Sequence, residues 1–178
     1  MKKISAIFLL AIFSGFAFTY ITKQNVSKSA ITFQIKNLGI NVDGSFNGLK
    51  AYINFDPSHP ESSAIEASVQ ANTINTDNDS RDTHLKSEDY FDVGKYPEIR
   101  MKSVSIKHNG GSNYTGTFNL TIKDKTNPVQ IPFTYTENGD AGNFKGTFKI
   151  KRTDYGVGGK SMVMSNDDTI SIDVSTSK

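Results

Sequence analysis

The chain has 178 residues, a formal net charge of +2 and no cysteine. This length suits one domain, and the lack of cysteine excludes disulfides, thiol catalysis and a lipid anchor on an N-terminal cysteine. The 20 lysines and arginines are interspersed with 18 acidic residues, so the basic stripe that nucleic-acid-binding proteins carry is missing.

The first residues have the order of a secretory signal peptide. Two lysines precede an apolar run over residues 4–13, and small residues follow up to Ala17. The apolar character continues to Ile21, so an uncleaved membrane anchor is the alternative. We expect residues 1–17 to be a cleaved signal peptide, residues 18–29 to be a short flexible segment, and the protein to be periplasmic or secreted.

From Ala30 onward, apolar residues recur at every second position in eight separate runs. A period of two is typical of β-strands with one buried face. Short turns rich in Gly, Asn and Asp separate the later runs, so these strands are expected to pair as antiparallel hairpins. The apolar positions are, in chain order, Ile31, Phe33 and Ile35; Leu49, Ala51, Ile53 and Phe55; Ile65, Ala67, Val69 and Ala71; Ile99, Met101, Val104 and Ile106; Tyr114, Gly116, Phe118, Leu120 and Ile122; Val129, Ile131, Phe133 and Tyr135; Phe144, Gly146, Phe148 and Ile150; and Ile170, Ile172 and Val174.

The fourth run changes its apolar parity near Ser103, which predicts a β-bulge at this point. Eight amphipathic strands with short links suit a sheet that closes into a barrel. A two-sheet sandwich would show the same alternation, so periodicity leaves both architectures open, with a slight preference for the barrel.

Residues 77–92 interrupt the strand series, because charged and polar side chains here surround a few apolar ones without a period of two. Asp79 and Ser80 are both suited to cap the N-terminus of a short helix. We therefore predict a helical excursion between two strands. It would carry Arg81, Asp82, His84 and Leu85.

Several segments have an order and composition that point to one family. They are Gly44-Ser45-Phe46 with Phe55-Asp56-Pro57, the run RDTHLKSEDYFD at 81–92, Lys95-Tyr96-Pro97, the run GTFNLTI at 116–122 and RTDYG at 152–156. In these segments the chain resembles the YceI-like family of bacterial periplasmic proteins. The resemblance implies that residues 30–178 form an all-β domain, an extended eight-stranded antiparallel, lipocalin-like β-barrel with a short helical excursion. It favours the barrel over the sandwich.

The resemblance also implies an apolar tunnel that binds a polyisoprenoid or another long-chain amphiphile. The inward face mixes large side chains with alanine and glycine, which leaves room for one ligand unless aromatic residues fill the space. We predict that an isoprenoid or fatty-acid-like lipid, such as an isoprenoid quinone or a polyprenyl phosphate, binds here and is exchanged with a membrane. No other cofactor is expected. The predicted lining residues are Phe33, Ile35, Leu49, Ala51, Ile53, Ala67, Val69, Met101, Gly116, Phe118, Leu120, Ile131, Phe133, Phe148, Ile150 and Ile172.

We expect residues 77–92 to cover the tunnel as a lid. The polar residues of this segment would fasten it to the barrel or, alternatively, grip an anionic headgroup. The predicted lid or headgroup residues are Arg81, His84, Leu85, Tyr90 and Phe91.

An enzymatic role for the same segment is the main alternative to lipid binding. His84 lies near Asp82 and Asp89, and such a cluster could hold a metal or act as a general base. The other two histidines are distant in the sequence, and no nucleophile-elbow or phosphate-binding glycine motif occurs. We therefore expect a protein that is not an enzyme, with no catalytic residue and no metal site. A structural or stress-related envelope protein with a packed barrel is the remaining alternative.

Overall fold

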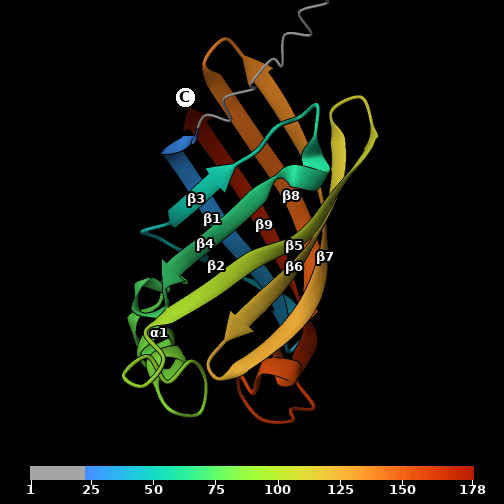
Figure 1. Ribbon diagram of the computed structural model, residues 1–178. Coiled ribbons are helices and arrows are strands. Elements are labelled where there is room, and N and C mark those ends of the chain that lie inside the picture. The colour runs from blue at the N-terminus through green and yellow to red at the C-terminus, as the bar shows by residue number, and fades with distance from the viewer. Residues whose placement is uncertain (1–22) are drawn as a thin grey trace, which may run out of the picture.

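Nine β-strands make up most of the part of the chain that the computed structural model describes, residues 23–178 (Figure 1). The signal peptide predicted for residues 1–17 lies outside these residues. The single α-helix of the described part, α1, spans Asp79–Lys86, and no helix there is long and apolar enough to cross a membrane. The strands are β1 Asn25–Asn37, β2 Ile40–Phe46, β3 Lys50–Asn54, β4 Ala64–Gln70, β5 Glu98–Gly110, β6 Asn113–Ile122, β7 Lys125–Asn138, β8 Ala141–Lys151 and β9 Met164–Ser177. Three short 3-10 helices are η1 Pro60–Ser62, η2 Ala71–Thr73 and η3 Arg152–Tyr155.

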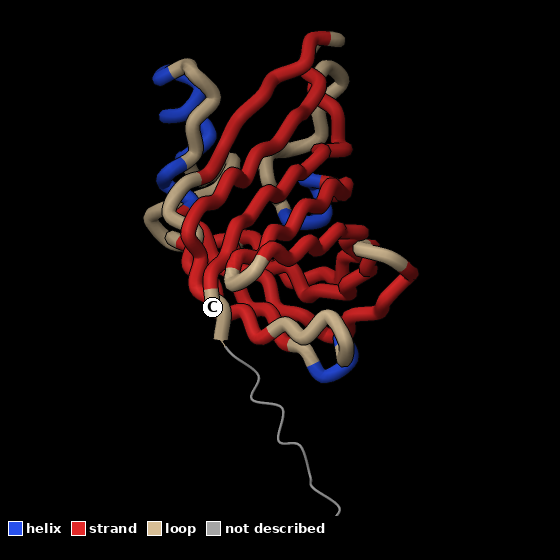
Figure 2. Tube along the Cα trace, turned by 90° about the horizontal axis from the view of Figure 1, so that it is seen from above, coloured by secondary structure: helices blue, strands red, loops and turns tan. Residues whose placement is uncertain are grey.

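All nine strands belong to one antiparallel sheet, whose order is β2-β1-β9-β8-β7-β6-β5-β4-β3. The sheet curls around a common interior as a half-barrel (Figure 2). Isolated bridges join regions near its two edges: the Gln24 amide donates to the Ile53 carbonyl at 2.9 Å, and Ser45 pairs with Asn75. The predicted antiparallel, barrel-like fold is confirmed.

The sheet has nine strands and not eight, because β2 also forms. Ile40 and Val42 alternate with polar residues in this strand, but Gly44 then interrupts the apolar series. No residue of β2 is fully buried, because the strand lies at one edge of the sheet. An edge strand with few buried side chains leaves only a weak signal in the sequence.

The first strand begins earlier than expected. The predicted flexible segment, residues 18–29, overlaps β1, which starts at Asn25. Main-chain pairing with the end of β9 holds residues 25–29, and the Gln24 side chain is only 2% exposed. Most side chains in this part of β1 are exposed, so they show no apolar alternation. The order comes from main-chain hydrogen bonds, which side-chain periodicity does not report.

The β-bulge predicted near Ser103 is confirmed. The register between β5 and β6 shifts between Ser103 and Ser105. Val104, the extra residue, is 61% exposed, whereas Ile106 is 2% exposed. The bulge therefore returns the apolar side chain of Ile106 to the inner face of the sheet.

A cluster of aromatic rings fills one end of the barrel. The Phe55 ring lies 4.8–6.0 Å, centroid to centroid, from the rings of Tyr114, Phe133, Tyr135 and Phe144. All five side chains are buried. We call these five residues the aromatic plug.

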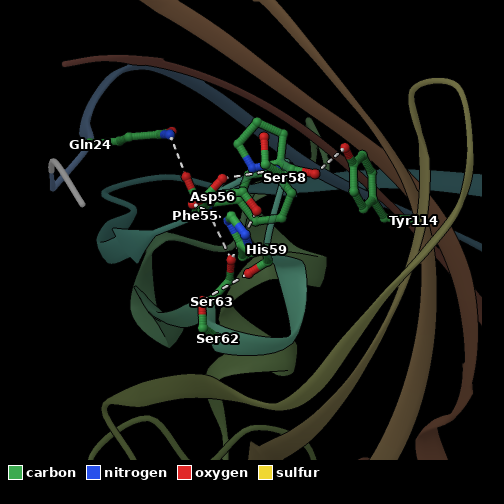
Figure 3. A network of polar contacts seen from close by, with 9 residues as sticks. Gln24, Phe55, Asp56, Ser58, His59, Ser62, Ser63 and Tyr114 are labelled. Atoms are coloured by element: carbon green, nitrogen blue, oxygen red, sulfur yellow. Dashed lines mark hydrogen bonds and ion pairs between the residues drawn. The ribbon is translucent and has the colours of Figure 1, made fainter. Parts of the chain in front are cut away.

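A network of polar contacts holds the chain on both sides of Phe55 (Figure 3). The Gln24 side-chain amide donates to the Phe55 carbonyl at 3.3 Å, and the Thr176 hydroxyl donates to the Gln24 side-chain oxygen at 2.9 Å. On the other side, the Asp56 carboxylate lies 3.1 Å from Nδ1 of His59. Because these contacts position the chain around Phe55, this end of the barrel is filled by protein.

Candidate ligand-binding cavity

Two adjoining apolar cavities lie inside the barrel. The larger one, which we call the outer cavity, has a volume of about 170 Å³ and is lined in part by Arg81 and Leu85 of α1. The helix α1 lies at one end of the barrel (Figure 1). The smaller one, the inner cavity, has a volume of about 90 Å³ and is lined in part by Phe133 and Phe144 of the aromatic plug. Residues that border both cavities form what we call the junction: Ile31, Ala67, Met101 and Ile172.

Every predicted lining residue except Gly116 borders one or both of these cavities. Ile31 of the junction was not predicted to line the tunnel. The outer cavity is lined by Phe33, Ile35, Val69, Leu120, Phe148 and Ile150. The inner cavity is lined by Leu49, Ala51, Ile53, Phe118, Ile131 and Phe133. The predicted residues at the junction are Ala67, Met101 and Ile172.

Gly116 has a different role from the expected one. A Cβ atom on Gly116 would lie 2.3 Å from the Phe118 ring, so the ring occupies the space of a side chain at this position. The same relation holds across β1 and β2, where a Cβ atom on Gly44 would lie 2.2 Å from the ring of its partner Phe33. These glycines allow the two rings to lie against the barrel wall. At these two positions, the free volume therefore lies beside the ring and not at the glycine.

The predicted helical excursion is present as α1, and its N-cap is Asn78 instead of Asp79 or Ser80. The Asn78 side chain accepts a hydrogen bond from the Arg81 amide at 2.9 Å. The excursion lies against the outer cavity, because three of its predicted apolar residues line that cavity: Leu85, Tyr90 and Phe91.

Two charged side chains fasten α1 to the preceding segment through Thr76. Arg81 donates from Nε to the Thr76 hydroxyl at 2.7 Å and from Nη2 to the Thr76 carbonyl at 2.6 Å. The buried Asp82 carboxylate accepts from the Thr76 hydroxyl at 2.5 Å and from the Thr76 amide at 3.0 Å. These hydrogen bonds hold α1 against the segment before it, as predicted for the polar residues of this segment. Arg81 also lines the outer cavity.

His84 lies on α1 but does not line the outer cavity, in contrast to the predicted headgroup contact. Its side chain is 62% exposed, and Nε2 lies 4.0 Å from the exposed carboxylate of Asp89. The His84 ring packs edge-on against Tyr90 with a centroid separation of 4.9 Å. Within residues 23–178, no group of His, Asp and Glu side chains is arranged to hold a metal ion.

Three charged residues that were not predicted to line a cavity also border the outer cavity, and two of them, Arg152 and Asp168, are not exposed. The first is Arg152 on η3, whose buried guanidinium donates to the main-chain carbonyls of Ser165 at 2.8 Å and of Val157 and Gly159 at 2.9 Å. These bonds hold the glycine-rich loop 154–159 against the outer cavity, which Val157 of this loop also lines.

The second charged residue is Asp168, which lies on the inner face of β9 in the row that continues with Ile170 and Ile172. Its Oδ1 atom is buried without a hydrogen-bond partner. Burial raises the pKa of this carboxyl to about 7, although a hydrogen bond from the Thr169 amide and the charge of Arg152 both lower it. The alternation that identified Ile170 and Ile172 extends back to Asp168, so this signal could have placed Asp168 in the lining.

Exposed apolar residues lie beside the outer cavity. Leu38 and Ile40, at the β1–β2 turn, are 71% and 69% exposed. Met162 and Val163, on the loop before β9, are also exposed. The Leu38 amide donates to the Val163 carbonyl at 2.8 Å, which brings the two loops together. Neighbouring residues in the sequence line the outer cavity: Asn37 precedes Leu38, Val42 lies two residues after Ile40, and Met164 follows Val163. We call Leu38, Ile40, Met162 and Val163 the apolar rim.

An antiparallel sheet that curls around an apolar interior is the architecture of small β-barrel proteins that enclose a single ligand. The chain belongs to the YceI-like family, since the sequence profile of the YceI-like domain matches residues 23–177. A UPF0312 protein of Pseudomonas paraeruginosa is 33% identical over 135 residues, which cover 71% of this chain and 70% of that protein.

Two solved structures share the fold. The crystal structure of BcnA from Burkholderia cenocepacia has a TM-score of 0.81 at 24% identity and covers 85% of this chain and 98% of that chain. A polyisoprenoid-binding domain from Saccharophagus degradans has a TM-score of 0.61 at 11% identity, with 87% of this chain and 97% of that chain covered. The family membership and the barrel-like fold predicted from the sequence are thereby confirmed.

Proposed function

We propose that this protein binds a long-chain amphiphilic lipid of the isoprenoid type inside its barrel, and that it sequesters or carries this lipid without chemical change. The observation that carries the proposal is the pair of adjoining apolar cavities that meet at the junction. A chain-like ligand suits two cavities in series, whereas a compact metabolite suits only one. The structural neighbour described as a polyisoprenoid-binding domain supports the same class of ligand.

Burial of the hydrocarbon chain supplies the binding free energy. Each buried methylene contributes about 0.8 kcal/mol, whereas a buried polar group without a partner costs roughly 2–7 kcal/mol. The tail would therefore occupy the inner cavity, where the lining is apolar, and the polar end would remain in the outer cavity with Arg81, Arg152 and Asp168. Met101 at the junction has an unbranched, flexible side chain that can move aside for a passing chain.

The proposal includes export and exchange with a membrane. Residues 1–17 would direct the protein to the periplasm or out of the cell. Exposed apolar side chains on adjoining loops can enter the interface of a bilayer, as those of the apolar rim would. Because the rim borders the outer cavity, a lipid would pass from the bilayer to the cavity with little exposure to water.

Native mass spectrometry of protein purified from its own host tests the lipid proposal. We expect a mass excess that disappears on denaturation, and a long-chain lipid in the organic extract of the same sample. Refilling of the delipidated protein with geranylgeraniol should be saturable at one molecule per chain. A protein that carries no lipid and takes up no geranylgeraniol would contradict the proposal.

Transfer kinetics from lipid vesicles test the apolar rim. Replacing Leu38 and Ile40 together by Asp should slow the transfer of geranylgeraniol from vesicles about tenfold, because two charges would oppose insertion into the interface. The affinity for geranylgeraniol dispersed in detergent should stay unchanged. Val104→Asp is the matched control, since Val104 is a comparably exposed apolar residue on β5. Equal slowing by the control would show that the rim has no special role.

A further inference from the structure

The carboxyl group of Asp168 stands out in the outer cavity because nothing in the barrel accounts for it. On β9, Asp168 pairs in register with Ile35 of β1 and with Ile150 of β8, and both of these side chains line the same cavity. The strand register thus directs a carboxyl group into an apolar lining. Its Oδ1 atom has no hydrogen-bond partner, and such a buried, unpaired oxygen is costly unless something binds to it.

Arg152, the cation whose charge acts on Asp168, is engaged elsewhere. Beyond its bonds to three main-chain carbonyls, the Arg152 guanidinium donates from Nη2 to the side-chain oxygen of Asn166 at 3.4 Å. Four of the five guanidinium N–H groups are used in this way. Within residues 23–178, no ion pair forms at Asp168.

The other charged groups that line the outer cavity are Arg81 and Arg100. Arg81 is held by its two hydrogen bonds to Thr76. Arg100 lies on β5 between Ile99 and Met101, whose side chains face inward, and Arg100 is exposed to solvent. Among these charged groups, the Asp168 carboxyl is the one with a buried atom that has no hydrogen-bond partner.

We propose that the Asp168 carboxyl binds the polar end of the lipid through a hydrogen bond, and that this end is an uncharged hydroxyl, amide or ketone and not a phosphate. The inference rests on the proposed lipid-binding function and adds the chemical class of the headgroup. It also sets the direction of the ligand, because Asp168 lies near the start of β9, at the end of the barrel that holds the apolar rim.

An uncharged headgroup follows from the chemistry around Asp168. A phosphate would place a second negative group beside the ionised carboxylate, and Arg152, the cation that acts on Asp168, already uses four of its five N–H groups for other contacts. A hydroxyl or an amide can donate to the carboxylate, and a protonated carboxyl can donate to a ketone or an amide oxygen. The raised pKa of Asp168 supports the second arrangement near neutral pH.

Equilibrium binding of three matched probes tests the inference: geranylgeraniol, geranylgeranyl phosphate and the hydrocarbon phytane. We expect the wild-type protein at about pH 8, where the Asp168 carboxyl is ionised, to bind the alcohol at least about tenfold more tightly than the phosphate. Asp168→Leu should weaken binding of the alcohol about tenfold and leave phytane unchanged, because only the hydrogen bond is lost. Asp168→Asn keeps an uncharged hydrogen-bonding group and should retain affinity for the alcohol within about threefold. Asp167→Leu is the control, since Asp167 is the exposed neighbour on the same strand.

The possible outcomes separate the two proposals. If wild-type protein binds all three probes but Asp168→Leu and Asp168→Asn change none of them, the headgroup site is wrong and lipid binding stands. Tighter binding of the phosphate than of the alcohol would also overturn the headgroup site alone. If folded wild-type protein binds none of the three, the lipid-binding function fails, and the headgroup site fails with it.

Discussion

The two ends of the barrel are built from the same alternating strands, yet one end is filled and the other is hollow. At the filled end, the Phe55 ring enters the interior from the chain after β3 and meets the other rings of the aromatic plug edge-on. At the hollow end, the Phe33 ring lies over Gly44 on the neighbouring strand, and the segment with α1 covers the space. Inward-facing apolar residues thus produce a packed core where aromatic rings point into the interior, and a cavity where the rings lie along the barrel wall.

Buried polar groups are present at both ends of the barrel. At the filled end, the buried Gln24 and Thr176 side chains hydrogen-bond to each other and to the main chain. At the hollow end, Asp168 keeps an oxygen without a partner. The Oδ1 atom of Asn54, directly before Phe55, also lacks a partner, but of these two oxygens only that of Asp168 belongs to a residue that lines the outer cavity, the part that we assign to a ligand.

The strongest test of this comparison is to truncate a ring at each end. Phe55→Ala should destabilise the protein by about 3–5 kcal/mol, because it leaves a cavity inside the aromatic plug. Phe46→Ala is the matched change at the hollow end, where the half-buried Phe46 ring lies 5.6 Å from the rings of Phe33 and Phe91. It should lower the free energy of unfolding by only about 1–2 kcal/mol. Urea unfolding measures both values, and equal losses would contradict the division into a filled and a hollow end.

The second test uses the pH dependence of stability. The pKa of Asp168 in the folded protein, about 7, lies above the ordinary value of 3.8, so the folded protein binds this proton more tightly than the unfolded chain does. The contribution of Asp168 to stability is therefore present in acid and is lost as the pH rises from about 4 to above 7, by up to about 4 kcal/mol. Asp168→Asn should remove this loss, so it should stabilise the protein more at pH 8 than at pH 5. Urea unfolding at both pH values, with Asp167→Asn as the control, would show no such difference if the carboxyl is solvated.

The third test compares two substitutions that add the same ring. Ala67→Phe places a ring at the junction and should lower the affinity for geranylgeraniol more than about tenfold, with a small change in stability. Gly116→Phe must displace the Phe118 ring and should instead cost about 1–3 kcal/mol of stability, with a smaller effect on the lipid. Thermal unfolding and lipid titration of both variants measure this contrast. A reversed result would place the open volume at Gly116.

The smallest effects concern the lid. Arg81→Ala removes two hydrogen bonds to Thr76, so it should lower stability by about 1–2 kcal/mol and speed the release of bound lipid. His84→Ala should change stability by less than about 0.5 kcal/mol and leave lipid release unaltered, because the side chain is exposed. Lipid dissociation rates and melting temperatures distinguish the two variants. Faster release or a loss of lipid in His84→Ala would instead show that this residue helps to hold the lid or the lipid.

The amino-acid sequence by itself determined the strands and the direction of most side chains within them. Neighbouring residues of a strand point to opposite faces, so alternation was enough to assign Ile35, Ile150 and Ile172 to the interior. The same rule located the bulge at Ser103, where the parity changes. The loss of alternation over residues 77–92 and the family resemblance of residues 81–92 predicted the helical segment that contains α1. Both signals depend on residues that are adjacent in the sequence.

Only the tertiary structure decided which parts of that interior are empty and which charges lack partners. The Phe118 ring covers Gly116, and His84 turns to solvent, although the sequence pattern suggested the opposite for both residues. Asp168 lacks a partner because Arg152 bonds to a loop that follows it in the chain and folds back over the barrel mouth. Ring direction, exposure and charge pairing depend on residues from distant strands, whereas alternation depends only on the local geometry of one strand.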